Sequence, residues 1–204
     1  MDNNVLMETV LDYNSKGDFK GHLEIWKVFS DGSKELHFSE DNVITSGMGA
    51  TLRNLFASTA KENINNYQIQ YFQLGVSGQS SQQVSSTGTL SGALATADYG
   101  TPNFVVEDRK LLAEGATADS VFGVIPFSYI KRINPTTVMY QIFIGEDACN
   151  VPAETSLSLS EIGIFSRNPT LASPEASMLC AYRYFTSITK TSSFSLLFRW
   201  TIEF

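Results

Sequence analysis

The side chains best suited to metal binding are the two histidines, His22 and His37. If their segment folds as a hairpin, His22 pairs with Asp41 and lies beside Glu24, a set that could hold a metal ion. The two imidazoles would share a face but lie about 13 Å apart at the rise of a strand, whereas zinc bonds to nitrogen measure about 2 Å. Because no third ligand follows at a fixed spacing, we interpret this set as a solvated polar face and predict no metal site.

Residues suited to covalent or cofactor chemistry lack the spacing that such chemistry needs. Serines are frequent, but there is no G-x-S-x-G elbow, and neither Cys149 nor Cys180 lies in a nucleophile motif. The glycine-containing turn at 74–78 lacks the pattern of a phosphate loop. With 21 acidic residues, some carboxylate pair will always be available, so such a pair identifies no active site. We therefore predict no catalytic residues, no cofactor and no enzyme activity.

Aromatic side chains offer another kind of site, a platform for a sugar ring or a protein partner. Of the candidates Trp26, Tyr99, Phe104, Tyr129 and Tyr184, most are expected in the core. Tyr99 and Phe104 differ because they lie in a polar loop with little core to join. Trp26 falls on the polar face of its hairpin, which faces either solvent or a partner. We predict subunit contacts at Trp26, Tyr99 and Phe104.

The composition disfavours several classes of partner. The chain has 204 residues and a formal net charge of -7, which argues against a phosphate-binding surface and hence against nucleic acid. No apolar stretch reaches about 18 residues, and the first residues lack the pattern of a signal peptide, so we expect neither a membrane span nor export. Both cysteines are expected to be reduced, as in a protein made in a cytosol.

The residue pattern from Phe19 to Thr45 predicts a β-hairpin. Asp31-Gly32 is a strong signal for a two-residue type I′ turn, and in that register Trp26 faces His37. We expect a core face made of Leu23, Ile25, Phe29, Leu36 and Phe38. We expect a solvent or partner face made of His22, Glu24, Trp26, Glu35, His37 and Asp41.

Ser46 is expected to cap a short helix over Met48 to Ala57, with an apolar stripe of Leu52, Leu55 and Phe56. Further strands are predicted at 67–76, 121–133, 136–145 and 157–166, with a turn at Asn134-Pro135. Residues 77–103 form a long loop rich in Ser, Thr, Gln and Gly. Residues 1–16 are treated as an N-terminal arm and 17–204 as one domain. About seven or eight strands with a single helix predict an all-β fold, an antiparallel β-sandwich.

The closing segment, Met178 to Phe204, is expected to be a hairpin that turns at 190–193. In its second half, FSLLFRWTIEF, one parity is wholly apolar, a period of two that predicts a strand with one buried face. The residues of that parity are Phe194, Leu196, Phe198, Trp200, Ile202 and Phe204.

Four stretches, in order, resemble a family of tailed-bacteriophage virion proteins. DNVITSGMGATLRNLF (41–56) is similar to the strand-to-helix step of phage tail and fibre-attachment domains, and IQYFQLGVSG (69–78) to the strand that follows it. LSEIGIFS (159–166) and the closing segment 178–204 resemble the family's later strands. The hairpin at 19–38 and the arm before it fall outside the resemblance.

The resemblance implies a structural protein of the virion, assembled in the host bacterial cytoplasm and devoid of catalytic residues. It would dock other virion proteins on the tail, neck or fibre-attachment side, in several symmetric copies such as a trimer or higher ring. A capsid decoration protein of the head is the alternative within this class. From the residues themselves, a carbohydrate- or receptor-binding β-sandwich module is the alternative of another class.

Overall fold

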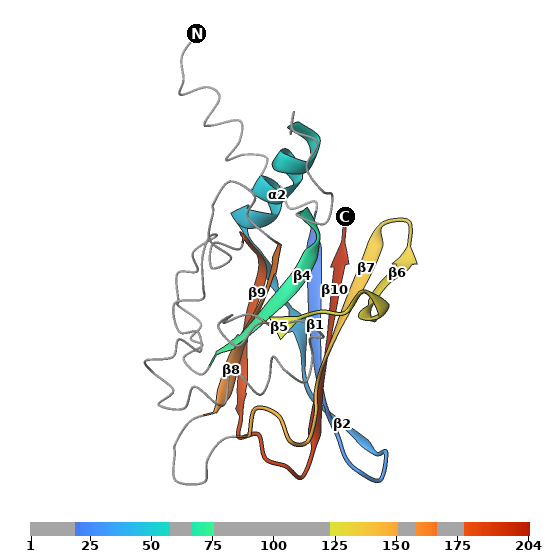
Figure 1. Ribbon diagram of the computed structural model, residues 1–204, viewed down its shortest axis with the longest axis vertical. Helices are drawn as coiled ribbons and strands as arrows, with labels where there is room; N and C mark the ends of the chain where they lie inside the picture. Colours follow the sequence, from blue (N-terminus) through green and yellow to red (C-terminus); the bar gives the residue numbers. More distant parts are fainter. Residues whose placement is uncertain (1–18, 58–66, 76–122, 151–157, 167–177) are drawn as a thin grey trace.

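Two five-stranded antiparallel sheets pack face to face in the computed structural model (Figure 1). The structure describes residues 19–57, 67–75, 123–150, 158–166 and 178–204. Within these residues the strands number ten, with one α-helix, which confirms the all-β sandwich. The predicted arm at 1–16 and the loop at 77–103, with Tyr99 and Phe104, lie outside the described residues.

The first sheet has the strand order β2-β1-β10-β7-β6. Its strands are β1 (Lys20–Val28), β2 (Lys34–Asp41), β6 (Ile130–Asn134), β7 (Thr137–Ile144) and β10 (Ser195–Glu203). The predicted turn at Asn134-Pro135 joins β6 to β7, and the Thr136 amide donates to Asn134 Oδ1 at 2.9 Å.

The second sheet has the order β3-β9-β8-β4-β5. Its strands are β3 (Val43–Ile44), β4 (Ile69–Gly75), β5 (Gly123–Val124), β8 (Leu159–Ser166) and β9 (Met178–Ile188). A 3-10 turn, η2 (Phe127–Tyr129), precedes β6, and the helix α2 (Ser46–Ala57) follows β3.

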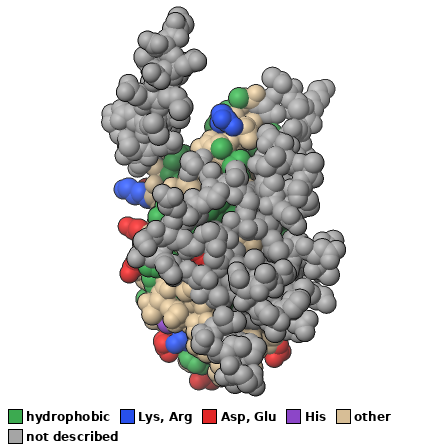
Figure 2. Space-filling view, turned by 90° about the vertical axis from the view of Figure 1, so that its left-hand side faces the viewer, with side chains coloured by type: hydrophobic (Ala, Val, Ile, Leu, Met, Phe, Trp, Pro, Cys, Tyr) green, Lys and Arg blue, Asp and Glu red, His purple; other side chains and the backbone are tan. Residues whose placement is uncertain are grey.

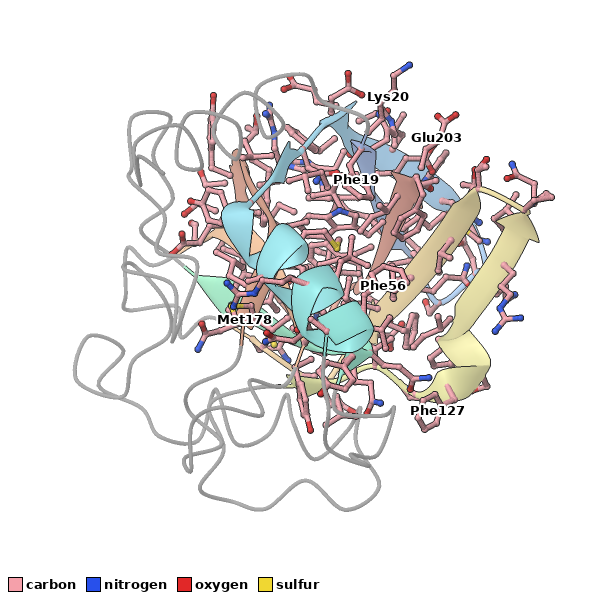
Figure 3. The ribbon with its side chains drawn as sticks, turned by 90° about the horizontal axis from the view of Figure 1, so that it is seen from above. Phe19, Lys20, Phe56, Phe127, Met178 and Glu203 are labelled. Atoms are coloured by element: carbon pink, nitrogen blue, oxygen red, sulfur yellow. The ribbon has the colours of Figure 1, made fainter. Side chains whose placement is uncertain are left out.

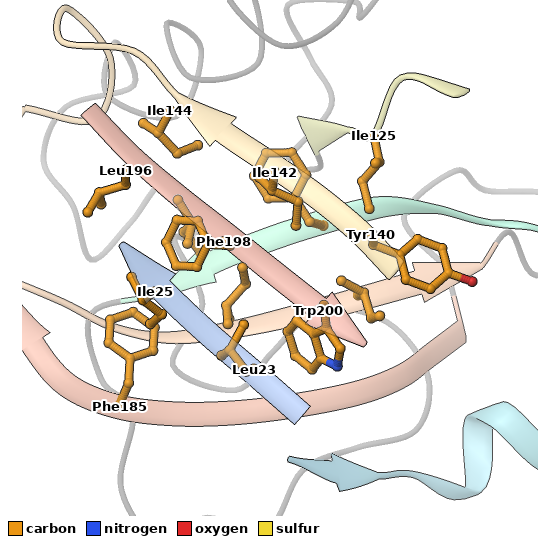
Figure 4. Packing of buried hydrophobic residues seen from close by; sticks show 14 of the residues in the cluster. Leu23, Ile25, Ile125, Tyr140, Ile142, Ile144, Phe185, Leu196, Phe198 and Trp200 are labelled. Carbon is orange, nitrogen blue, oxygen red and sulfur yellow. The ribbon is translucent and has the colours of Figure 1, made fainter. Parts of the chain in front are cut away.

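The core lies between the sheets, and β10 crosses its middle (Figure 4). Leu196, Phe198, Trp200 and Ile202 are fully buried, as the period of two predicts. Phe204 departs from that prediction, since it lies after the strand and is 44% exposed.

The closing segment is not a hairpin, which corrects the sequence prediction. β10 pairs with β1 and β7 in the first sheet, whereas β9 pairs with β8 and β3 in the second. The connection at 189–194 therefore crosses from one sheet to the other, a distance of about 10 Å. Both strands need one apolar face in either arrangement, so their pattern alone does not separate a hairpin from a crossing between sheets.

The turn between β1 and β2 also differs from the prediction. Gly32 has a φ of 82°, but Asp31 does not have a positive φ, so the turn is not type I′. The Phe29 amide instead donates to the Ser33 carbonyl at 3.0 Å, which makes the loop one residue longer. Asp31 Oδ1 accepts from the Ser33 amide at 2.8 Å, and hydrogen bonding to Ser33 lowers the pKa of that carboxyl.

A register shift between Ile25 and Trp26 absorbs the extra residue. Trp26 consequently faces Leu36 rather than His37. Leu36, predicted for the core, lies on the outer face and is 47% exposed. The bulge moves Leu36 because a shift of one residue exchanges the two faces of a strand.

Helix α2 lies across one end of the sandwich, as the view from above shows (Figure 3). It begins at Ser46, the residue predicted as its cap, so Thr45 holds the capping position. The Thr45 hydroxyl donates to the Leu179 carbonyl of β9 rather than to the helix, while the Met48 amide donates to the Thr45 carbonyl at 3.1 Å.

The buried side of α2 is narrower than predicted. Met48 and Thr51 are buried, and Leu52 packs against the core. Leu55 and Phe56, predicted for the same stripe, are exposed, and Phe56 is 81% exposed. The helix covers only the end of the sandwich, so its last turn extends past the core.

Candidate docking face

His22 lies where the hairpin register predicts a polar face, whereas His37 lies at the bulge, with its Nε2 2.9 Å from the Thr186 carbonyl oxygen of β9. His22 Nδ1 is 3.0 Å from Asp41 Oδ1, as expected, and His22 Nε2 is 3.0 Å from Ser39 Oγ. Asp41, His22 and Ser39 follow the order of acid, imidazole and hydroxyl in the catalytic triad of a hydrolase. The Asp41 side chain is 92% exposed, however, so water competes with His22 for hydrogen bonds to the Asp41 carboxylate. We interpret the three side chains as a surface polar ladder.

Metal-ligand side chains do not gather elsewhere in the described part of the chain. Within it, no three His, Cys, Asp or Glu residues are close enough together to hold an ion. The helical residues described there include no segment long and apolar enough to cross a bilayer.

Trp26 is the predicted contact residue that the structure describes, and it lies on the outer face of the first sheet. The register places it between Leu36 of β2 and Leu197 of β10, and Leu197 faces Phe143 of β7. Leu36 and Phe143 are 47% and 39% exposed, and the other two are partly exposed. These four residues form one apolar row across four neighbouring strands, called here the apolar row.

A polar row lies beside the apolar row. Glu24 of β1 faces Ser39 on one side and Arg199 on the other, and Arg199 faces Gln141. These four residues are called here the charged row. Its centre is an ion pair, with Arg199 Nη1 3.7 Å from Glu24 Oε2.

The charged row holds the Trp26 ring in place. Trp26 Nε1 donates to Glu24 Oε2 at 2.9 Å, and the Arg199 guanidinium carbon lies 5.8 Å from the Trp26 ring centroid. A partly exposed indole with both its polar edge and one face engaged loses little rotamer freedom when a partner covers it. A rigid aromatic side chain in an apolar row is a feature of protein interfaces.

The outer face of the second sheet contains a buried polar pair. Tyr182 Oη donates to Glu161 Oε2 at 2.9 Å, and both side chains are buried beside Phe165 and Leu179. Burial, and then the Glu161 carboxylate, raise the pKa of Tyr182. The pair is buried beneath the surface rather than presented to a partner.

Figure 2 views the molecule from the side on which β8 and β9 lie in Figure 1. The charged side chains of the described residues in this view are scattered over the upper end, one edge and the lower end, and the Lys and Arg side chains do not gather into one patch. This distribution accords with the formal net charge of -7.

Neither cysteine forms a disulfide, and both are buried. Cys180 Sγ lies 3.6 Å from both Thr51 Oγ1 and Ser166 Oγ, at the contact between α2 and the second sheet. Burial raises the pKa of the Cys180 thiol, which keeps it protonated and unreactive. We assign the thiol to packing.

Comparison of the chain with protein-family models, with curated proteins and with solved structures found no significant match. Sequence reasoning identified Trp26 but missed its three neighbours in the apolar row. The bulge concealed Leu36, and Leu197 and Phe143 occupy outward positions that only the pairing of β1, β10 and β7 brings together. Leu197 was visible as the single apolar residue on the polar parity of its strand.

Proposed function

We propose that this protein is a structural subunit of a tailed-bacteriophage particle, on the tail, neck or fibre-attachment side. It docks other particle proteins through the outer face of the first sheet. The observation that carries the docking role is the apolar row of Leu36, Trp26, Leu197 and Phe143. The virion assignment rests on the four stretches that resemble phage virion proteins.

The face has the anatomy of a protein interface. An apolar centre with a fixed indole is bordered by the charged row, as the apolar core of an interface is bordered by a polar rim. Contiguous apolar residues on a soluble surface favour association because burying them removes about 25 cal/mol per Å² of unfavourable hydration. The face therefore suits a partner that covers it.

The rest of the proposal follows from the same class of protein. The subunit assembles in the host bacterial cytoplasm, a compartment in which cysteines without a disulfide, such as Cys149 and Cys180, are stable. Its partners are other virion proteins and copies of itself, and neither nucleic acid nor membrane. Tyr99 and Phe104 stay predictions for further subunit contacts.

Immunogold labelling of intact particles of the encoding phage tests the location. Antibody against the purified protein should label the tail, neck or fibre-attachment end. Label confined to the head would contradict the tail-side assignment and favour the alternative, a capsid decoration protein. Absence of the protein from purified particles, measured by mass spectrometry, would contradict the virion role itself.

A carbohydrate- or receptor-binding module is the alternative of another class, and the surroundings of Trp26 are the observation that favours it. An indole with a carboxylate and a guanidinium beside it can stack on a sugar ring and bind its hydroxyl groups. A glycan array with the purified protein separates the two functions. Binding that is lost on Trp26→Ala would favour the sugar module over docking.

A further inference from the structure

On the outer face of the first sheet, the residues of β2 and β1 complement in type the residues that face them across the sheet on β7 and β10. β1 and β10 lie at the centre of the four strands that form the apolar row, with β2 and β7 outside them. Consider a two-fold axis that lies in the plane of the face, runs parallel to the strands and passes between β1 and β10. Rotation about it places β1 of one copy over β10 of a second, and β2 over β7, while each row keeps its position along the strands.

The charges of the face complement one another under this rotation. Glu24 of one copy meets Arg199 of the other, and Arg199 meets Glu24, because these residues face each other between β1 and β10. Lys20 and Glu203 face each other in the same way at the end of the sheet, where Figure 3 shows them side by side, so they exchange too. Four opposite-charge contacts result, and no like charges of these rows meet.

The uncharged positions agree with the charged ones. In the apolar row, Trp26 meets Leu197 of the second copy and Leu36 meets Phe143. In the charged row, Ser39 meets Gln141, two polar side chains of which one carries an amide donor. Apolar groups thus meet apolar groups in the apolar row, and opposite charges meet in the charged row. In the row of His22, which lies between the charged row and Lys20, His22 meets Thr201 of the second copy, and Asp41 meets Met139 at the edge of the four strands.

We propose that the occupant of this face is a second copy of the same chain, packed sheet against sheet about this two-fold axis. The proposal rests on the docking role proposed for the face and names its partner. Aligned packing within about 30° between two twisted sheets allows the rows to stay matched near the axis. Such an interface is isologous, because both copies contribute the same surface patch. In assemblies with dihedral symmetry, interfaces of this kind join one ring of subunits to another.

The size of the face places the proposed contact among small interfaces. Four strands at strand spacing, over the seven residues from Lys20 to Trp26, cover roughly 450 Å² in projection. A standard interface buries about 800 Å² per partner, so the contact falls at the small end, where weak and transient contacts are found. We therefore propose a dissociation constant in the micromolar range. The dimer should therefore be visible by sedimentation at high protein concentration and dissociate on dilution.

Charge reversal at the central pair tests the proposal. Sedimentation equilibrium on the full chain should show that Glu24→Arg alone and Arg199→Glu alone each weaken dimerisation about tenfold or more, since like charges then meet across the axis. An equimolar mixture of the two variants should form a heterodimer, because the copy with an arginine at both positions then faces the copy with a glutamate at both. Lys131→Glu, on β6 outside the four exchanged strands, is the control and should dimerise like the natural chain.

The mixture separates a contact between copies from an effect within one copy. Glu24 and Arg199 also pair within one chain, and a variant weakened only by that loss would not be rescued by mixing. A natural chain that stays monomeric at about 100 μM, well above a micromolar dissociation constant, or a mixture that stays monomeric, would overturn the proposal. The docking role would survive that result if Trp26 variants were still lost from particles, and would fall with it if they were not.

Discussion

Lys190 Nζ lies 3.0 Å from Asn150 Oδ1, so a buried ammonium ties the crossing between β9 and β10 to the segment after β7. The same nitrogen donates to the carbonyls of Glu146, at 3.1 Å, and Thr191, at 2.8 Å. It also lies 5.3 Å from the Phe194 ring centroid. One side chain thus holds the crossing at 189–194 against the segment that follows β7.

Lys190→Met should destabilise the fold by at least about 2 kcal/mol, because it removes the buried donor of three hydrogen bonds. Urea unfolding measures the change. Lys34→Met on β2 is a matched control at an exposed site and should alter stability by less than about 0.5 kcal/mol. Equal changes in the free energy of unfolding at the two positions would show that the Lys190 ammonium does not stabilise the crossing between β9 and β10.

Gly75→Ala should be costly for a different reason. A Cβ at Gly75 would overlap the Glu161 carboxyl, whose place is set by the hydrogen bond from Tyr182. We expect a loss of about 1–3 kcal/mol from overpacking. Gly145→Ala, where a Cβ meets open space, is the control and should be neutral or slightly stabilising in the same unfolding assay. A neutral Gly75→Ala would contradict the packing of Glu161 against β4.

Stability should fall in alkaline solution. Burial raises the pKa of Tyr140 and of Tyr182 above the ordinary value of 10.0, and that of Cys180 above 9.0. The folded state therefore keeps protons that the unfolded state releases, so the free energy of unfolding declines as the pH rises through about 9 to 11. Tyr140→Phe should make this decline shallower in urea titrations at several pH values, and an unchanged slope would contradict the assignment.

Trp200 should dominate the stability of the closing strand. It is fully buried, and Trp200→Ala should cost about 3–5 kcal/mol. Trp200→Phe should cost less than about 1.5 kcal/mol, because Trp200 Nε1 is buried without an acceptor among the described residues, so its loss breaks no hydrogen bond.

Removal of residues 200–204 should leave insoluble protein. A soluble, folded truncation would show that the end of β10 is peripheral.

Periodicity predicted the local structure well where a strand is regular. Leu196, Phe198 and Trp200 are buried because alternation fixes which face of β10 is apolar, whatever its partners. The sandwich class followed from the number of such strands and the single helix. The burial of both cysteines agrees with their interpretation as small apolar side chains.

The partners of each strand could not be predicted from the same pattern. Nothing local distinguishes a closing hairpin from a crossing at 189–194, and one bulge moved Leu36 from the expected core to the outer face. The stripe of α2 was misjudged because Phe56 lies past the end of the core. The apolar row depends on pairings between distant segments, so Trp26 alone was visible in the sequence.

The central claim, that the protein is a particle subunit docked through this face, is tested most directly by incorporation of a variant into particles. Phage encoding Trp26→Arg should yield a folded protein that is depleted at least about tenfold from purified particles, because a charge then occupies the centre of the apolar row. Lys131→Glu, on β6 of the same sheet, should be incorporated normally. Quantitative mass spectrometry of purified particles gives the result, and normal incorporation of folded Trp26→Arg protein would contradict the account.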